Sequence, residues 1–180
     1  MEDRRVEFEA LVAAYERRIY NVLLRMVSDP EEAADLTQET FVKAYKSFDR
    51  FRAESQPYTW IYRIAVNSAK DSLNSRKRRH AKEIETSRLE ASMPLSAWEP
   101  TDQSESPDER LLRQELSAQI ERAIDQMPTD YREVIILREY QGLSYEQVAE
   151  ALDTTLESVR SRLARARAWL RQRLSSYIEP

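Results

Sequence analysis

Residues 141–173 read QGLSYEQVAEALDTTLESVRSRLARARAWLRQR and predict two helices joined by a tight turn. Gly142 is the only glycine of the chain, and it follows a helix expected to end near Tyr140, where a residue with positive φ is needed. Ser144 and Gln147 have the spacing of a capping box, which starts the first of the two helices. This arrangement is that of a helix-turn-helix unit, whose second helix lies in a DNA groove.

The second helix of this unit is strongly basic. Thr154 and Glu157 repeat the capping signature at its start. Six arginines against one glutamate give residues 156–174 a net charge of +5. Arginine suits bidentate contacts with guanine edges and phosphates, and although a solvated surface helix would explain the charge alone, the turn before it favours DNA binding. The inward stripe consists of Val159, Leu163, Ala166, Leu170 and Leu174.

The composition favours an all-α protein without catalytic activity. The 180 residues include one glycine and no cysteine, so few tight turns and no disulfides or thiolate chemistry are expected. His80 is the only histidine, and neither a glycine-rich phosphate loop nor a metal-ligand spacing is present. We therefore expect no enzyme, no cofactor and no metal. The sequence contains neither a signal peptide nor an apolar run of membrane-spanning length, so we expect a cytoplasmic protein.

Charge and proline content divide the chain into two small helical domains joined by a flexible acidic linker. Residues 60–80 carry a net charge of +5, whereas residues 81–110 carry −5. Pro94, Pro100 and Pro107 mark the linker, together with several serines and threonines and an unusual Trp98. We expect an N-terminal domain at 1–87, the linker at 88–107 and a C-terminal domain at 108–180.

A second basic constellation lies in the third predicted helix, which begins near Pro57 and ends near Lys82. Its regularly spaced polar residues combine phosphate contacts from Arg and Lys with base-edge hydrogen bonds from Asn. The nearby aromatic side chains could stack on unpaired bases or belong to the core. A core position is favoured for Trp60 and for its aliphatic neighbours Ile61 and Ile64. The loop 51–56 is the better candidate for a pocket. The polar face consists of Arg63, Asn67, Lys70, Asn74 and Lys77, and the aromatics are Phe51, Tyr58, Trp60 and Tyr62.

Four strings together resemble one protein family. They are DLTQETFVKAYKSFDRFR at 35–52, YTWIYRIAVNSAK at 58–70, LREYQGLSYEQVAEAL at 137–152 and SVRSRLARAR at 158–167. In this order they resemble bacterial sigma factors of the extracytoplasmic-function class, over nearly the whole chain outside the linker. The resemblance implies a promoter-specificity factor that binds core RNA polymerase and directs initiation at alternative, stress-responsive promoters.

The resemblance also assigns expected sites. The second helix, at about 29–48, would dock on the clamp helices of polymerase through outward-facing Asp35, Gln38, Glu39, Val42 and Lys43, and the polymerase flap would be a further partner of the chain. By spacing, Ala34, Thr37, Phe41, Ala44, Tyr45 and Phe48 face inward. The −10 promoter element would be read by Phe51, Arg52, Ala53, Glu54, Ser55, Gln56, Arg63, Asn67 and Lys70, with the loop and Asn67 capturing a flipped-out base. The −35 element would be read in the major groove by Arg160, Ser161, Arg162 and Arg165.

Family analogy further implies a separate anti-sigma protein that wedges between the two domains. Thr155 and Glu157 stand where many relatives carry a proline and a glycine, and Asp71 stands where relatives often have a neutral amide. We expect an acid near DNA to change base preference. The alternative function is a helix-turn-helix regulator that acts without being a polymerase subunit, although such a regulator does not need the constellation at 56–79.

Overall fold

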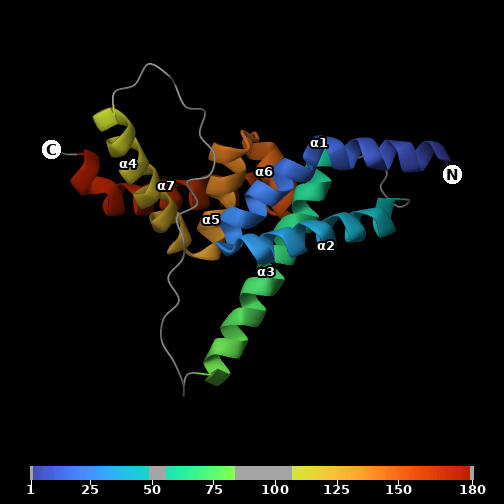
Figure 1. Cartoon of the computed structure of the whole chain (residues 1–180), viewed down its shortest axis with the longest axis horizontal. Helices are drawn as coiled ribbons and strands as arrows, with labels where there is room; N and C mark the ends of the chain where they lie inside the picture. The colour runs from blue at the N-terminus through green and yellow to red at the C-terminus, as the bar shows by residue number, and fades with distance from the viewer. Residues whose placement is uncertain (1, 49–55, 84–106, 179–180) are drawn as a thin grey trace.

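The computed structural model of the chain describes residues 2–48, 56–83 and 107–178, and every element in these ranges is helical (Figure 1). The prediction of an all-α fold is therefore confirmed. Residues 88–106 of the predicted linker, including Trp98, lie outside the described residues, whereas Pro107 is the first residue of a helix. No helix in the described ranges is long and apolar enough to cross a membrane. The elements are α1 (Glu2–Val27), α2 (Pro30–Phe48), α3 (Pro57–Glu83), α4 (Pro107–Asp125), α5 (Thr129–Ile135), the π-helix η1 (Ile136–Tyr140), α6 (Tyr145–Leu152) and α7 (Leu156–Ile178).

Helices α1, α2 and α3 pack against one another and form the N-terminal bundle. The chain turns between α1 and α2 at Ser28, which has a positive φ of 59°. Asp29 then caps α2, because its Oδ1 accepts a hydrogen bond from the Glu32 backbone N–H at 2.9 Å. The apolar face predicted for the first helix is fully buried in the C-terminal part of α1, where the residues inaccessible to solvent are Ile19, Val22, Leu23 and Met26.

The buried face of α2 differs in part from the predicted stripe. Thr37, Phe41 and Ala44 are buried and Phe48 is half-buried, as expected. The predictions for Ala34 and Tyr45 are wrong, because Ala34 is exposed and Tyr45 is 59% exposed. Each follows a buried alanine directly and is therefore rotated about 100° away from the core. The Tyr45 ring makes an edge-to-face contact with the Phe8 ring, with centroids 5.1 Å apart. The core positions that the spacing missed are Ala33, Leu36 and Thr40.

Helices α4, α5, η1, α6 and α7 form the C-terminal bundle. The predicted turn is confirmed, since Gly142 has φ +70° and Ser144 and Gln147 form a complete capping box. The cap predicted at Thr154 is wrong. Thr155 lies directly before α7, and its hydroxyl accepts a hydrogen bond from the Ser158 N–H at 3.1 Å. Helix α6 ends at Asp153, which adopts the left-handed conformation with φ 51°. The cap of α7 therefore lies one residue later than predicted.

The two bundles pack directly against each other. Helix α3 contacts α6, and α1 contacts α4, α5 and η1. Figure 1 shows α6 beside the crossing of α1 and α3. Buried apolar residues of both bundles belong to one hydrophobic cluster, which reaches from Phe8 to Ala166. The molecule is therefore closed, with the helix-turn-helix unit packed against the N-terminal bundle.

Candidate nucleic-acid interface

The basic face of α7 is held outward by its buried stripe. Val159, Leu163 and Ala166 are at most 1% exposed and anchor the helix against the C-terminal bundle. The predicted reader residues Arg160, Ser161 and Arg165 consequently lie at the surface. Their neighbour Arg167 is also exposed and pairs with Glu139 of η1 at 2.7 Å.

The four predicted residues of α7 are not equivalent. Arg165 donates a hydrogen bond of 3.3 Å from its Nη1 to the hydroxyl of Tyr131, which raises the arginine pKa. Arg162 instead points into the bundle and pairs with Glu133 at 3.0 Å. The structure therefore leaves Arg165 available to a ligand and assigns Arg162 an internal partner.

Two of the α3 residues predicted to contact promoter DNA, Arg63 and Lys70, are held by the C-terminal bundle. Arg63 donates from Nη2 to the backbone carbonyl of Glu150 on α6 at 2.5 Å. Lys70 pairs through Nζ with Oε2 of Glu133 on α5 at 2.6 Å. Asn67, one turn away from each of them, is exposed. The structure thus places the three residues on one helix, as predicted, but only Asn67 faces solvent freely.

The aromatic residues of α3 are also engaged. Tyr62 is 2% exposed and donates its hydroxyl proton to Oε1 of Gln141 at 3.0 Å. Burial raises the pKa of Tyr62 to about 12. The Tyr58 hydroxyl accepts a hydrogen bond from Nε2 of Gln147. The core position expected for Ile61 is confirmed at 0% exposure, whereas Trp60 is only half-buried. In this arrangement Tyr58 and Tyr62 serve the contact between the bundles.

The predicted pocket loop is described at one position only. Gln56 is exposed directly before α3, and its carbonyl accepts a hydrogen bond from the Thr59 hydroxyl at 2.8 Å. Residues 51–55, namely Phe51, Arg52, Ala53, Glu54 and Ser55, lie outside the described residues.

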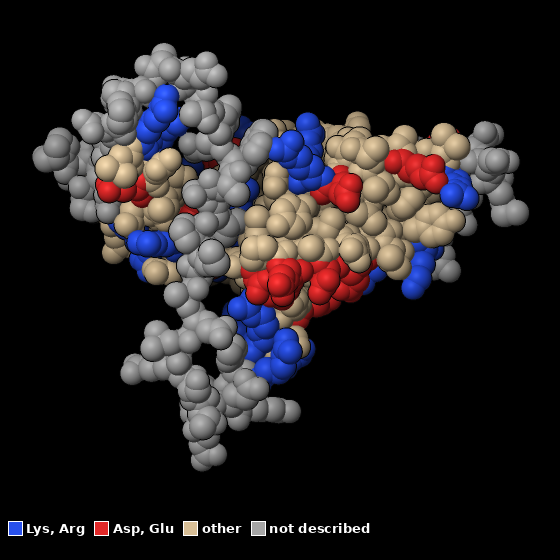
Figure 2. All heavy atoms as spheres, in the orientation of Figure 1, with Lys and Arg blue, Asp and Glu red and all other residues tan. Residues whose placement is uncertain are grey.

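The outward face of α2 forms a mixed acidic and apolar surface. All five residues predicted there are exposed, including Val42 at 52%. Lys43 pairs with Glu39 at 2.6 Å and donates to the Ser68 hydroxyl at 3.0 Å. Figure 2 shows acidic side chains gathered over α2, above basic side chains at the far end of α3. The five residues of this α2 face are Asp35, Gln38, Glu39, Val42 and Lys43.

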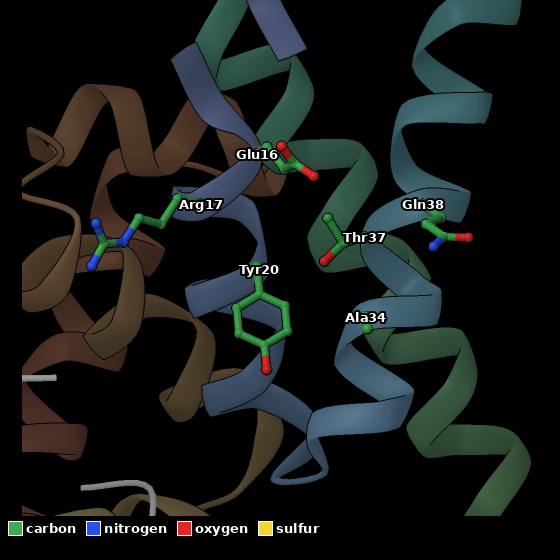
Figure 3. Close-up of a pocket in the computed structure, with 6 residues that line it drawn as sticks. All are labelled: Glu16, Arg17, Tyr20, Ala34, Thr37 and Gln38. Carbon is green, nitrogen blue, oxygen red and sulfur yellow. The ribbon is translucent and has the colours of Figure 1, made fainter. Parts of the chain in front are cut away.

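A shallow hollow of about 280 Å³ lies between α1 and α2, next to the α2 face (Figure 3). Tyr20 of α1 projects toward the space between the two helices, and Gln38 belongs to both the hollow and the α2 face. The remaining lining residues are Glu16, Arg17, Ala34 and Thr37. A protruding side chain of a docked protein would fit a depression of this size.

Glu133 is the principal residue that sequence reasoning missed. Its side chain is 0% exposed, and its two oxygens pair with Lys70 of α3 and Arg162 of α7. Burial raises the pKa of Glu133, while the hydrogen bond and charge of Lys70 act in the opposite direction. A glutamate directly before the buried run 134–137 was the available signal, because helical spacing places residues 133 and 137 on the same side.

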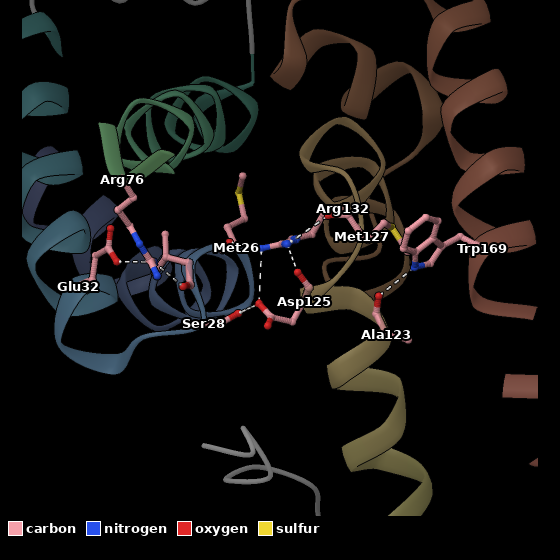
Figure 4. Close-up of polar contacts among 10 residues, drawn as sticks. Met26, Ser28, Glu32, Arg76, Ala123, Asp125, Met127, Arg132 and Trp169 are labelled. Atoms are coloured by element: carbon pink, nitrogen blue, oxygen red, sulfur yellow. Dashed lines mark hydrogen bonds and ion pairs between the residues drawn. The ribbon is translucent and has the colours of Figure 1, made fainter. Parts of the chain in front are cut away.

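The preceding residue, Arg132, joins the ends of helices from both bundles (Figure 4). Its guanidinium donates to the Met26 carbonyl of α1 at 2.6 Å, to the Met127 carbonyl at 3.1 Å and to the Asp125 carbonyl of α4. Burial lowers its pKa, although the nearby Asp125 opposes this. Asp125 in turn accepts a hydrogen bond from the Ser28 hydroxyl. Residues 132 and 133 together contact four other helices, α1, α3, α4 and α7, in addition to their own.

The paired basic helices and the helix-turn-helix unit define a DNA-reading transcription protein, and comparison with known proteins gives its family. Residues 11–79 match the family described as Sigma-70 region 2, and residues 117–170 match Sigma-70, region 4. The RNA polymerase sigma-H factor of Pseudomonas aeruginosa is 40% identical over 160 residues, which cover 89% of this chain and 82% of that protein. The ECF RNA polymerase sigma-E factor of Haemophilus influenzae is 37% identical over 167 residues, covering 93% and 87%.

Solved structures share the fold. The sigma factor RpoE in complex with the anti-sigma factor NepR, from Bartonella quintana, aligns with a TM-score of 0.74 at 22% identity, covering 94% of this chain and 97% of that chain. CnrH in complex with the cytosolic domain of CnrY aligns with a TM-score of 0.65 at 23% identity, covering 96% and 90%. The chain belongs to the sigma-70 family, in its extracytoplasmic-function class. It is a promoter-specificity factor for transcription initiation.

Proposed function

We propose that the two basic helices are the two promoter readers of this sigma factor. The observation that carries the proposal is the presence, on one chain, of exposed Asn67 on α3 and exposed Arg160, Ser161 and Arg165 on α7. On this proposal, α3 and the loop 51–56 read and melt the −10 element, and α7 reads the −35 element. Arg63 and Lys70 become fully available to DNA when the bundles separate, whereas Arg162 keeps its partner Glu133 within the C-terminal bundle.

The proposed partner of the α2 face is the clamp of core RNA polymerase, with the flap contacting the C-terminal bundle. An acidic surface with one exposed valine and an adjacent hollow suits a basic and partly apolar protein surface. Polymerase supplies the catalysis of RNA synthesis, and the sigma factor supplies the choice of promoter. We place the protein in the cytoplasm, where polymerase acts, and its promoters among those of a stress response.

We further propose that the chain divides functionally at 1–87, 88–107 and 108–180, and that an anti-sigma protein inhibits it. The support for an inhibitor is the pair of structural neighbours, each a complex with such a protein or with a cytosolic domain. The acidic linker would thread toward the polymerase active centre.

Transcription in vitro tests the reader assignments. Purified protein, core polymerase and fragmented genomic DNA of the source bacterium should yield specific transcripts. On a promoter found in this way, Asn67→Ala should reduce strand opening by about tenfold, measured by permanganate reactivity of unpaired thymines, because a base contact is lost. Gln114→Ala changes an exposed amide residue of α4, outside both proposed readers, and is the control. Equal opening by both variants would contradict the role of Asn67.

Core binding tests the α2 face separately. Val42→Glu places a charge on a residue that is 52% exposed, so the fold should tolerate it. We expect weaker binding to core polymerase in fluorescence anisotropy. Val6→Glu, at a valine of α1 that is 60% exposed, controls for the added charge. If Val42→Glu binds core polymerase as well as Val6→Glu does, the α2 face is not the docking surface.

A further inference from the structure

One buried carboxylate holds a cation from each of the two proposed promoter readers. Glu133 lies on α5, and its side chain is fully buried. Its Oε2 pairs with Nζ of Lys70 from α3 at 2.6 Å, and its Oε1 pairs with Nη1 of Arg162 from α7 at 3.0 Å. The pair with Lys70 crosses between the bundles, whereas the pair with Arg162 stays within the C-terminal bundle.

Other contacts between the bundles surround this arrangement and depend on the same closure. Arg63 donates to the Glu150 carbonyl at 2.5 Å, and Tyr62 donates to Gln141 at 3.0 Å. Arg132, next to Glu133 on α5, donates to the carbonyl of Met26 at the end of α1 at 2.6 Å. The short helix α5 is thus fixed to both α1 and α3 through two adjacent side chains.

The ion pair with Glu133 competes with DNA for Lys70. The Lys70 ammonium lies 2.6 Å from a carboxylate that has no solvent exposure, and the Lys70 side chain is only 29% exposed, so a DNA phosphate must draw the ammonium away from Glu133 to become its main partner. Arg63 is likewise held against α6. In the closed chain, fewer cations of the proposed −10 reader are therefore available to contact DNA.

We propose that Glu133, with Lys70 and Arg162, forms an interdomain latch that keeps the polymerase-free protein closed and withholds Lys70 from DNA. When the latch opens, Lys70 becomes available while Arg162 continues to neutralise Glu133 from within the same bundle. The carboxylate therefore never loses both partners, which makes opening reversible at a moderate cost. The same chain thus carries a restraint on DNA reading that requires no inhibitor protein.

The distance between the bundles tests the latch without polymerase or promoter, so its failure is separable from failure of the reader assignments. The chain contains no cysteine. Cysteines introduced at the exposed residues Arg78 of α3 and Gln172 of α7 are therefore the only thiols of the chain, and they can carry a donor dye and an acceptor dye. Single-molecule energy transfer should show one predominant closed population in the otherwise unchanged protein.

Two substitutions break the latch from opposite sides. Lys70→Met removes the cation of α3 and Glu133→Gln removes the carboxylate of α5, and each should lower the closed-to-open ratio by about tenfold. Glu139→Gln is the control, because it breaks the Arg167–Glu139 pair within the C-terminal bundle. If Glu133→Gln proves unstable, Lys70→Met decides the question alone, since Lys70 is partly exposed and lies outside the C-terminal bundle.

Amine labelling measures the availability of Lys70 directly. A short pulse of reductive dimethylation, quantified by mass spectrometry, should modify Lys70 several-fold more slowly than exposed Lys77 of the same helix. Glu133→Gln should bring the two rates together, whereas Glu139→Gln should not.

Several results would overturn the proposal. An open population in the unchanged protein, unchanged energy transfer in Lys70→Met, or equal opening by the Glu139→Gln control would each do so. Opening by Glu133→Gln without opening by Lys70→Met would show that the glutamate acts only through Arg162, and this also refutes the latch. Labelling of Lys70 at the rate of Lys77 in the unchanged protein would also refute the latch.

Discussion

Arg162 and Arg165 lie three residues apart on α7 but have different surroundings, so replacing each with alanine should separate stability from DNA reading. Arg162 pairs at 3.0 Å with the fully buried Glu133, whereas the exposed Arg165 donates a hydrogen bond of 3.3 Å to the Tyr131 hydroxyl. Both substitutions remove the same chemical group from the same helix. Each is therefore the matched control for the other.

The expected stability effect follows from burial. A hydrogen bond to a charged group contributes about 1.5–3 kcal/mol when its partner is buried. Because Lys70 continues to neutralise Glu133, we expect the lower half of this range, about 2 kcal/mol, for Arg162→Ala. For a chain of this length that corresponds to a decrease in Tm of about 4–8 °C. Arg165→Ala removes no buried partner and should change the free energy of unfolding by less than about 0.5 kcal/mol.

Urea unfolding and promoter binding measure the two effects. Trp169 of α7 donates to the Ala123 carbonyl at 3.1 Å and provides a fluorescence signal close to the substitutions. Arg165→Ala should weaken binding of the polymerase complex to a −35 duplex by about tenfold or more, through loss of a base or phosphate contact. If Arg162→Ala is as stable as the unchanged protein, or if Arg165→Ala is the less stable variant, the pair with buried Glu133 does not contribute the expected stability.

Two further predictions concern the turn and the closed interface. Gly142→Ala should lower the free energy of unfolding by about 1 kcal/mol through its φ of +70° alone, because an added Cβ meets nothing within 4 Å. Gly142→Asn should cost less in the same urea titration, and equal costs would point to a steric cause instead. The pKa of Tyr62 is raised to about 12 by burial, so its contribution to stability is complete below pH 10 and is lost as pH rises from 10 to 12. Tyr62→Phe should make stability fall less steeply across that interval, measured by urea unfolding at several pH values.

Local features of the fold were predictable from the sequence because their causes are local. The capping box at Ser144 and the positive φ of Gly142 depend on residues within one helical turn. The stripe of α7 follows from helical spacing, and four of its five residues are buried. The errors are local as well: Tyr45 is one residue off the buried face, and the cap of α7 is Thr155 instead of Thr154.

The contact between the bundles was not predictable in the same way. Lys70 and Glu133 are 63 positions apart, and neither spacing nor composition indicates that they pair. The sequence predicted correctly that Arg63, Asn67 and Lys70 share one face of α3. It did not predict that Arg63 and Lys70 face protein in the closed chain, because this depends on how two separately formed bundles meet.

The packing of α3 against α6 has a consequence for the order in which the protein is made. Helix α3 ends at Glu83, and α6 begins at Tyr145. At typical ribosomal rates, about 3–12 s pass between the synthesis of these two residues. During this interval the N-terminal bundle has no α6 to cover Arg63 and no α5 to hold Lys70. In each newly made chain, Arg63 and Lys70 are therefore uncovered at first, and the two bundles close only after the second half of the chain has been translated.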